Sequence, residues 1–112
     1  MRDAAQRVVE KSHGMTYAQF AIDDWFMSAV IQHLSMIGEA CLHLPEDLLS
    51  RHPEIPWREI RGMRHVVVHE YFRVDPEIMW NTVQSRLPEL VIQLDGVLSR
   101  EFPEDNSAAD RV

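Results

Sequence analysis

The sequence predicts an all-α protein, folded as a small antiparallel bundle of four to five helices. Apolar residues recur at spacings of three and four along several segments, which is the pattern of amphipathic helices. No segment shows the sustained alternation of apolar and polar residues that is typical of strands. The 112 residues, of which 46% are hydrophobic, are enough for one hydrophobic core but not for two.

The amino-terminal half contains two predicted helices. A short amphipathic helix is expected over 3–11 and stops near Gly14. A longer helix runs from about Asp23, or a few residues earlier, to Leu42. Gly38 lowers the helix propensity of this segment and allows a neighbouring helix to pack closely. The apolar stripe of the long helix consists of Ile22, Trp25, Phe26, Ala29, Val30, Leu34 and Ile37.

Prolines mark the helices that follow. Pro45 opens one or two helical turns over 44–49, because proline fits the first turn of a helix. Pro53 and Pro56 then interrupt the chain. The next helix is expected over residues 57 to about 70, which include most of the histidines and arginines discussed below.

The last helix is expected to start at Asp75-Pro76-Glu77. Asp can cap a helix, Pro fits its first turn, and Glu favours the positive end of its dipole. Pro88 must kink or interrupt this helix, because it lacks an N–H donor and clashes with the preceding turn. The apolar positions of the helix are Ile78, Val83, Leu87, Leu90, Val91, Leu94 and Val97.

The domain organisation and the class of protein follow from simple counts. Residues 1–102 form one domain, and the polar segment 103–112 has no apolar period, so we expect a disordered tail. Cys41 is the single cysteine, which excludes an internal disulfide framework and fits a reducing cytoplasm. No apolar run approaches the roughly 20 residues of a membrane span, and the amino terminus is too charged for a secretory signal.

Charge is distributed unevenly along the chain. The formal net charge is −7, which argues against a general nucleic-acid binder. The window 51–73 nevertheless contains five Arg and three Glu, a local net charge of +2, together with three of the six histidines. This window suggests a local site for an anion, although a solvated helix face of Arg and Glu would give the same pattern.

A helical wheel of the segment 57–70 separates two faces. Ile60, Met63 and Val67 cluster with Trp57 and Tyr71 on the side expected to face the core. The next arc carries four polar residues. They are Arg64, Arg61, His65 and His69. Arginine offers paired donors that match phosphate oxygens, and histidine exchanges protons near neutral pH. These residue types suit metal-independent cleavage of RNA, in which a histidine takes the proton of the 2′-OH and an arginine stabilises the negative charge that develops on the phosphorane.

Other interpretations of the same residues stay open. Arg64 would be purely structural if it paired with an acid such as Glu39, and His69 would be an ordinary histidine at the end of a helix. His65 and His69 also have the i, i+4 spacing of two metal ligands. The chain has no thiolate cluster to complete such a site, so we expect no metal and no cofactor.

The segment from Trp57 to Asp75, WREIRGMRHVVVHEYFRVD, resembles the HepT-like (DUF86) branch of the HEPN superfamily. Two other stretches resemble it as well, and the likeness covers about 20–94. They are IGEA at 37–40 and Trp80 with LPEL at 87–90. The resemblance implies an all-α domain that dimerises and places the Arg-x4-6-His motifs of two subunits around a shared cleft. It also implies a metal-independent endoribonuclease, the toxin of a type VII toxin–antitoxin pair.

The resemblance assigns roles to individual residues. It implies that Arg64 and His69 are the catalytic pair, and that Tyr71 is the tyrosine to which a minimal nucleotidyltransferase antitoxin transfers AMP. Arg61 and His65 are then auxiliary phosphate- and RNA-binding residues. AMP on Tyr71 would place bulk and negative charge beside an anion-binding cleft. The alternative function is a non-catalytic dimeric HEPN module that binds the nucleotidyltransferase, and a plain structural protein is a third possibility.

Two features depart from the family pattern. His65 stands where HEPN proteins often have Asn or Asp, and it is either a second proton-transfer group or the mark of a weakened enzyme. The region before Phe20 is short for the family, so either the start site is misassigned, or the first helix is reduced and dimerisation covers more of the core.

Overall fold

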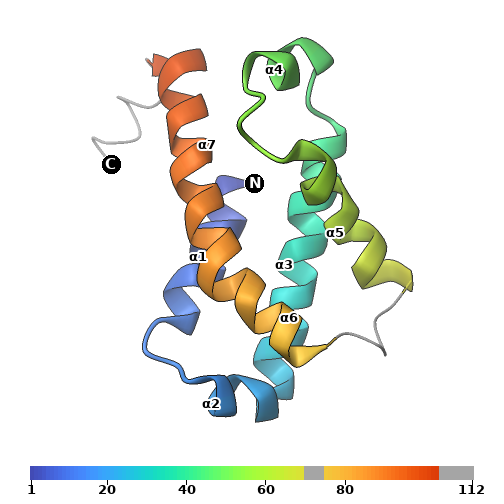
Figure 1. Ribbon diagram of the computed structural model, residues 1–112, viewed down its shortest axis with the longest axis vertical. Coiled ribbons are helices and arrows are strands. Elements are labelled where there is room, and N and C mark those ends of the chain that lie inside the picture. The colour runs from blue at the N-terminus through green and yellow to red at the C-terminus, as the bar shows by residue number, and fades with distance from the viewer. Residues whose placement is uncertain (70–74, 104–112) are drawn as a thin grey trace.

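The computed structural model describes residues 1–69 and 75–103, and within α5 it describes the side chains only as far as Arg64. Every regular element in this part of the chain is helical, which confirms the all-α prediction (Figure 1). The elements are α1 (Arg2–Ser12), α2 (Tyr17–Ile22), α3 (Asp24–Leu42), α4 (Glu46–Arg51), α5 (Trp57–His69), α6 (Pro76–Asn81), a π-helical segment (Thr82–Arg86) and α7 (Leu87–Glu101). The expected disordered tail falls almost wholly on 104–112, outside the described residues.

The long helix expected from about Asp23 is preceded by a separate short helix, α2. Thr16 and Gln19 form a capping box at the start of α2, with N–H···O distances of 2.9 and 3.2 Å. Asp23 then ends α2 and caps α3, because its Oδ1 accepts from the backbone N–H of Phe26 at 2.9 Å. The one or two helical turns expected over 44–49 are present as α4, which begins directly after Pro45, whereas α2 was not expected as a separate helix.

The two proline predictions for the last helical region are confirmed. Asp75 caps α6 by accepting from the backbone N–H of Glu77 at 2.9 Å, and Pro76 occupies the first turn. Before Pro88 the backbone widens into the π-helical segment and then resumes as α7. The α-helical hydrogen-bond pattern is thus interrupted before Pro88, as its missing N–H requires, and the π-helical segment joins α6 to α7.

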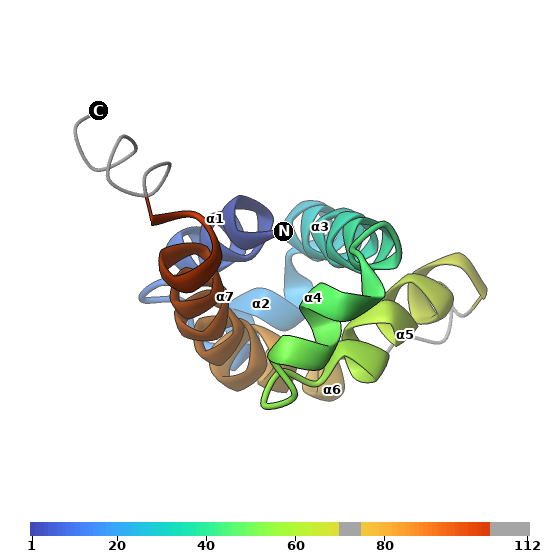
Figure 2. The same ribbon diagram turned by 90° about the horizontal axis from the view of Figure 1, so that it is seen from above.

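The four longer segments pack around a common core. α3 lies along α5, and α1 packs against both α3 and α7 (Figure 2). The short helices α2 and α4 lie at opposite ends of the bundle (Figure 1). The largest fully buried side chains come from α2, α3, the loop before α5, α5, the π-helical segment and α7, and they include Phe20, Ile37, Ile55, Ile60 and Leu87. None of the described helices combines the length and the apolar character needed to cross a membrane.

The predicted apolar stripe of α3 is only partly buried. Val30, Leu34 and Ile37 are in the core, whereas Trp25 and Ile22 are 89% and 83% exposed. The turn at Asp23 separates Ile22, in α2, from the helical phase of α3. Trp25 belongs to α3, but it lies about 140° around the helix from the buried Val30. The end of α2 and the start of α3 therefore present Ile22 and Trp25 to solvent.

A group of charged residues ties α4 to the end of α7, and we call Arg51, His52 and Glu101 the α4–α7 clamp. Arg51 binds the Glu101 carboxylate through two N–H groups, at 2.9 and 3.1 Å. His52 is 3% exposed, and its Nε2 lies 2.8 Å from the same carboxylate. Bonds from Arg51 and His52 lower the pKa of Glu101 to about 2.

Candidate functional site

α5 carries the basic motif and is fixed at its first turn. Trp57 and Ile60 are buried, and Met63 is half-buried, as the helical wheel predicts. The indole N–H of Trp57 donates to the backbone carbonyl of His52 at 2.9 Å, which anchors the start of the helix to the preceding loop. Val67 and Tyr71, which were also expected on the core side, lie outside the described side chains.

α3 approaches α5 most closely at Gly38. A Cβ atom on Gly38 would lie 2.9 Å from the backbone nitrogen of Arg64 and 3.0 Å from the carbonyl oxygen of Ile60. These are backbone atoms, which cannot rotate away, so only glycine fits here without a shift of the helices. The close packing expected at Gly38 is present, and it occurs at the motif arginine.

Arg64 lies at the surface where α3 meets α5, and it is paired. Its Nε lies 2.5 Å from Oε2 of Glu39, and the Nε2 of His43 lies 3.4 Å from Oε1 of the same carboxylate. We call Glu39, His43 and Arg64 the α3–α5 seam. The side chains of Arg64 and Glu39 are 51% and 49% exposed, so the guanidinium remains accessible to solvent. The pairing of Arg64 with Glu39, which the structural interpretation of Arg64 requires, is therefore present.

Arg61 faces α3 as well, but it has different neighbours. Its guanidinium lies 3.9 Å from Glu46 at the start of α4 and approaches the Cys41 thiol. The Nε atom of Arg61 is buried without a hydrogen-bond partner. Burial raises the pKa of the Cys41 thiol, and the Arg61 guanidinium opposes part of that rise. Arg61 thus covers a buried thiol and is less accessible than Arg64 to a ligand in solvent.

The remaining predicted site residues are described incompletely. The backbone of His65 and His69 belongs to α5, but their side chains lie outside the described part, and so does all of Tyr71. The structure therefore does not test whether the two histidines and Arg64 converge, nor whether the histidines form a metal pair. Among the described residues, no group of three or more His, Cys, Asp or Glu side chains could hold a metal ion.

The tertiary structure adds carboxylates to the basic window. Glu39 pairs with Arg64, and Glu46 lies near Arg61, although both acids precede the window in the sequence. The local charge of +2 is therefore partly compensated in space. His43 was missed by the sequence analysis, although its i, i+4 spacing from Glu39 on one helix was a signal that could have identified the pair.

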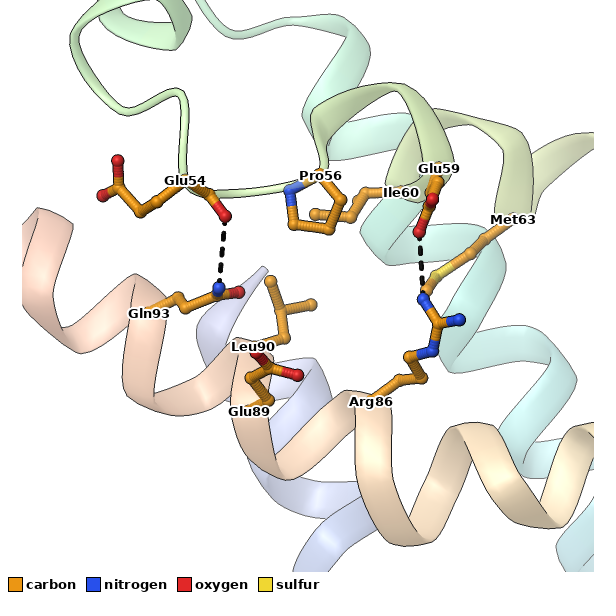
Figure 3. A pocket seen from close by; sticks show the side chains of 9 residues that line it. All are labelled: Glu54, Pro56, Glu59, Ile60, Met63, Arg86, Glu89, Leu90 and Gln93. Atoms are coloured by element: carbon orange, nitrogen blue, oxygen red, sulfur yellow. Dashed lines mark hydrogen bonds and ion pairs between the residues drawn. The ribbon is translucent and has the colours of Figure 1, made fainter.

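A cavity of about 250 Å³ lies on another flank of α5 (Figure 3). Glu59 and Arg86 form an ion pair of 3.0 Å across it, and the Gln93 side chain donates to the Glu54 carbonyl at 3.4 Å. The lining residues are Glu54, Pro56, Glu59, Ile60, Met63, Arg86, Glu89, Leu90 and Gln93. The carboxylates of Glu59 and Glu89 against the guanidinium of Arg86 do not suit an RNA phosphate. The α3–α5 seam is the better candidate for an anion.

Comparison with known proteins identifies the family. A model of HepT-like ribonucleases matches residues 1–97 of the chain. The chain belongs to the HepT-like ribonuclease family. A relative in Caldanaerobacter subterraneus subsp. tengcongensis, named "Putative RNase", is 36% identical over 94 residues, which are 84% of each chain. "Probable ribonuclease HepT" of Thermococcus cleftensis is 39% identical over 88 residues, 79% of this chain and 80% of that protein. No solved structure matches.

Proposed function

We propose that this protein is a metal-independent endoribonuclease, with Arg64 and His69 as its catalytic residues. The observation that carries the proposal is the match of residues 1–97 to the HepT-like ribonuclease family, which includes the whole Arg64-x4-His69 motif. The relatives named as ribonucleases agree with it. The half-exposed position of Arg64 adds support, because a phosphate can reach its guanidinium from solvent.

The proposed reaction is an internal transesterification of RNA. His69 removes the proton from a ribose 2′-OH, and the resulting oxygen attacks the adjacent phosphorus, so that a P–O bond forms and the bond to the 5′ oxygen breaks. Arg64 stabilises the negative charge that develops on the phosphate oxygens. Protonated histidine, supplied by His69 or by the auxiliary His65, returns a proton to the leaving 5′ oxygen. DNA lacks the nucleophile and is not a substrate.

The functional unit is proposed to be a homodimer with a cleft shared between the two subunits. The exposed Trp25 and Ile22 support this, because large apolar side chains at such exposure favour burial against a second surface. Sedimentation of the wild-type protein should give a dimer at micromolar concentration. Replacing Trp25 with Asp should shift it toward monomer without loss of helical content, because this side chain contributes little to the core.

The cellular role we propose is that of a toxin, controlled by a minimal nucleotidyltransferase antitoxin that transfers AMP from ATP to Tyr71. The adenylate would add bulk and negative charge two residues from His69, so RNA phosphate would be repelled from the site. Mass spectrometry after incubation with ATP and a cognate nucleotidyltransferase should find AMP on Tyr71, and the modified protein should no longer cleave RNA.

The decisive experiment is RNA cleavage by purified protein in EDTA. We expect the wild type to cut RNA and the His69→Ala variant to lose at least about a hundredfold in rate, the usual size of a general acid–base contribution. Circular dichroism of the variant should match the wild type, so that the loss is not one of folding. Equal cleavage by His69→Ala, or loss of cleavage in EDTA that Mg²⁺ restores, would contradict the proposal.

The second candidate is a non-catalytic dimeric module that binds the nucleotidyltransferase. The ion pair between Arg64 and Glu39 favours it, because a guanidinium held by a carboxylate has an evident structural use. This candidate requires normal AMP transfer to Tyr71 together with no cleavage of any RNA and no growth inhibition on expression. RNA cleavage and AMP transfer can both be measured on one preparation of protein, and cleavage distinguishes the two candidates.

A further inference from the structure

The α3–α5 seam contains an acid that the proposed mechanism does not use. Glu39 lies on α3, and its carboxylate contacts Arg64 of α5 through one oxygen and His43 of its own helix through the other. We propose that Glu39 is a positioning residue that orients the Arg64 guanidinium for an incoming phosphate. This inference rests on the proposed function, in which that phosphate belongs to RNA.

The contact is made by the atom of Arg64 best suited to this role. Glu39 pairs with Nε, on the inner edge of the guanidinium. Arginine carries four more N–H groups on its two terminal nitrogens, and these form the edge that can bind a phosphate through two parallel bonds. A carboxylate at Nε fixes the plane of the group, while the terminal edge is available for the ligand.

The rest of the seam limits the movement of Glu39 and Arg64. Gly38 brings the backbone of α3 against the backbone of Arg64, which fixes the distance between the two helices at this point. His43, one turn after Glu39, lies 3.4 Å from the second carboxylate oxygen and restrains the side chain from the other side. Two consecutive residues of α3 thus set both the backbone position and the side-chain orientation of the motif arginine.

The opposite role, in which Glu39 competes with phosphate for Arg64, is disfavoured by exposure. Both side chains are about half-exposed, and water weakens such a pair, so little energy holds Arg64 away from a ligand. The backbone contact at Gly38 fixes the two helices, so even a weak pair biases the orientation of the guanidinium. A guanidinium already biased toward the bound orientation loses less entropy when it binds the transition state. Positioning predicts a loss of activity without Glu39, whereas competition predicts a gain.

The test compares two substitutions of Glu39 with a matched pair elsewhere on α5. In Glu39→Gln the side-chain carbonyl still accepts from Nε, and in Glu39→Ala nothing does. We expect Glu39→Ala to lower kcat about tenfold to a hundredfold with a smaller change in KM, and Glu39→Gln to recover most of the rate. Glu59→Ala removes an exposed Glu–Arg pair of the same kind, with Arg86, and should leave kcat and KM unchanged.

A measurement that needs no cleavage separates this inference from the proposed function. In ¹⁵N spectra, the Nε–H signal of Arg64 should be slow to exchange in the wild type and should move or broaden in Glu39→Ala. It should stay in place in Glu59→Ala. An RNA with a single 2′-deoxy substitution should bind Glu39→Ala more weakly than it binds the wild type.

Three results would overturn the inference: an unchanged Arg64 signal in Glu39→Ala, a higher rate or tighter RNA binding in either Glu39 variant, or a loss of rate explained by unfolding. If the wild type cleaves no RNA but the Arg64 signal moves as expected, the proposed function fails while the positioning of Arg64 by Glu39 stands.

Discussion

The α3–α5 seam and the α4–α7 clamp contain the same three residue types in opposite settings. Each joins an arginine, a histidine and a glutamate from two helices. In both regions the arginine and the histidine meet one carboxylate, but the clamp histidine is 3% exposed and the seam histidine is 76% exposed. Residue type alone therefore does not identify an anion site. The two arginines are equally exposed, at 50% and 51%, so the bonds they already make decide the difference. Arg51 uses all three of its guanidinium nitrogens on Glu101 and Asp47, whereas the contact of Arg64 with Glu39 uses Nε and leaves the terminal edge for a ligand.

The largest expected effect distinguishes the two histidines. His52→Ala should destabilise the protein by about 2 to 4 kcal/mol, because it empties a buried position and removes a hydrogen bond to a carboxylate. His43→Ala, at an exposed position, should change stability by less than about 0.5 kcal/mol. Urea unfolding followed by circular dichroism measures both. Similar losses for the two variants would show that the clamp is not the more structural of the regions.

The next effect concerns how tightly the helices meet at the seam. Gly38→Ala forces a Cβ to within 3.0 Å of two backbone atoms of α5. Overpacking of this kind costs about 1 to 3 kcal/mol, which exceeds the gain of about 1 kcal/mol in helix propensity. We therefore expect net destabilisation in thermal unfolding.

The matched control for this substitution is Gly62→Ala within α5, where a Cβ would meet nothing within 4 Å. This variant should gain the helix propensity without a clash and should stabilise the protein by up to about 1 kcal/mol. Destabilisation by both substitutions, or by neither, would contradict a close contact that is specific to Gly38.

The smallest effect is the pH dependence that the clamp contributes. The pKa of Glu101 is about 2 in the folded protein, below its ordinary value of 4.5, chiefly because Arg51 and His52 donate to it. Protonation therefore favours the unfolded state. The stabilisation is complete above about pH 5 and is lost as the pH falls toward 2.

Glu101→Gln tests this pH dependence, because the amide does not titrate. The variant should be less stable than the wild type at pH 7, and the difference should shrink steadily between about pH 5 and pH 2. Unfolding midpoints measured across this range check the prediction. A difference that stays constant with pH would mean that the charge on Glu101 does not stabilise the clamp.

The helices themselves could be predicted from the sequence because their signals are local. Asp75 and Pro76 begin α6, and Pro88 is preceded by the π-helical segment, since capping and the missing proline N–H act within one or two turns. The sequence also places the start of the long helix near Asp23. It does not reveal that Asp23 both ends α2 and caps α3. The exposure of Trp25 follows from the wheel of α3 itself, because Trp25 lies about 140° from the buried Val30 and about 180° from the buried Leu34.

The sequence by itself determined the longer helices, because hydrogen bonds and steric effects within a few residues fix where a helix forms. It also determined the family and the motif, because both depend on the order of the side chains along the chain. Only the tertiary structure decided which charges meet. Glu101 reaches Arg51 and His52 from about 50 positions away, and Glu39 reaches Arg64 from another helix. An ion pair between helices depends on how the chain packs. For that reason the basic window 51–73 of the sequence is partly neutralised in the folded protein, where Glu39 contacts Arg64.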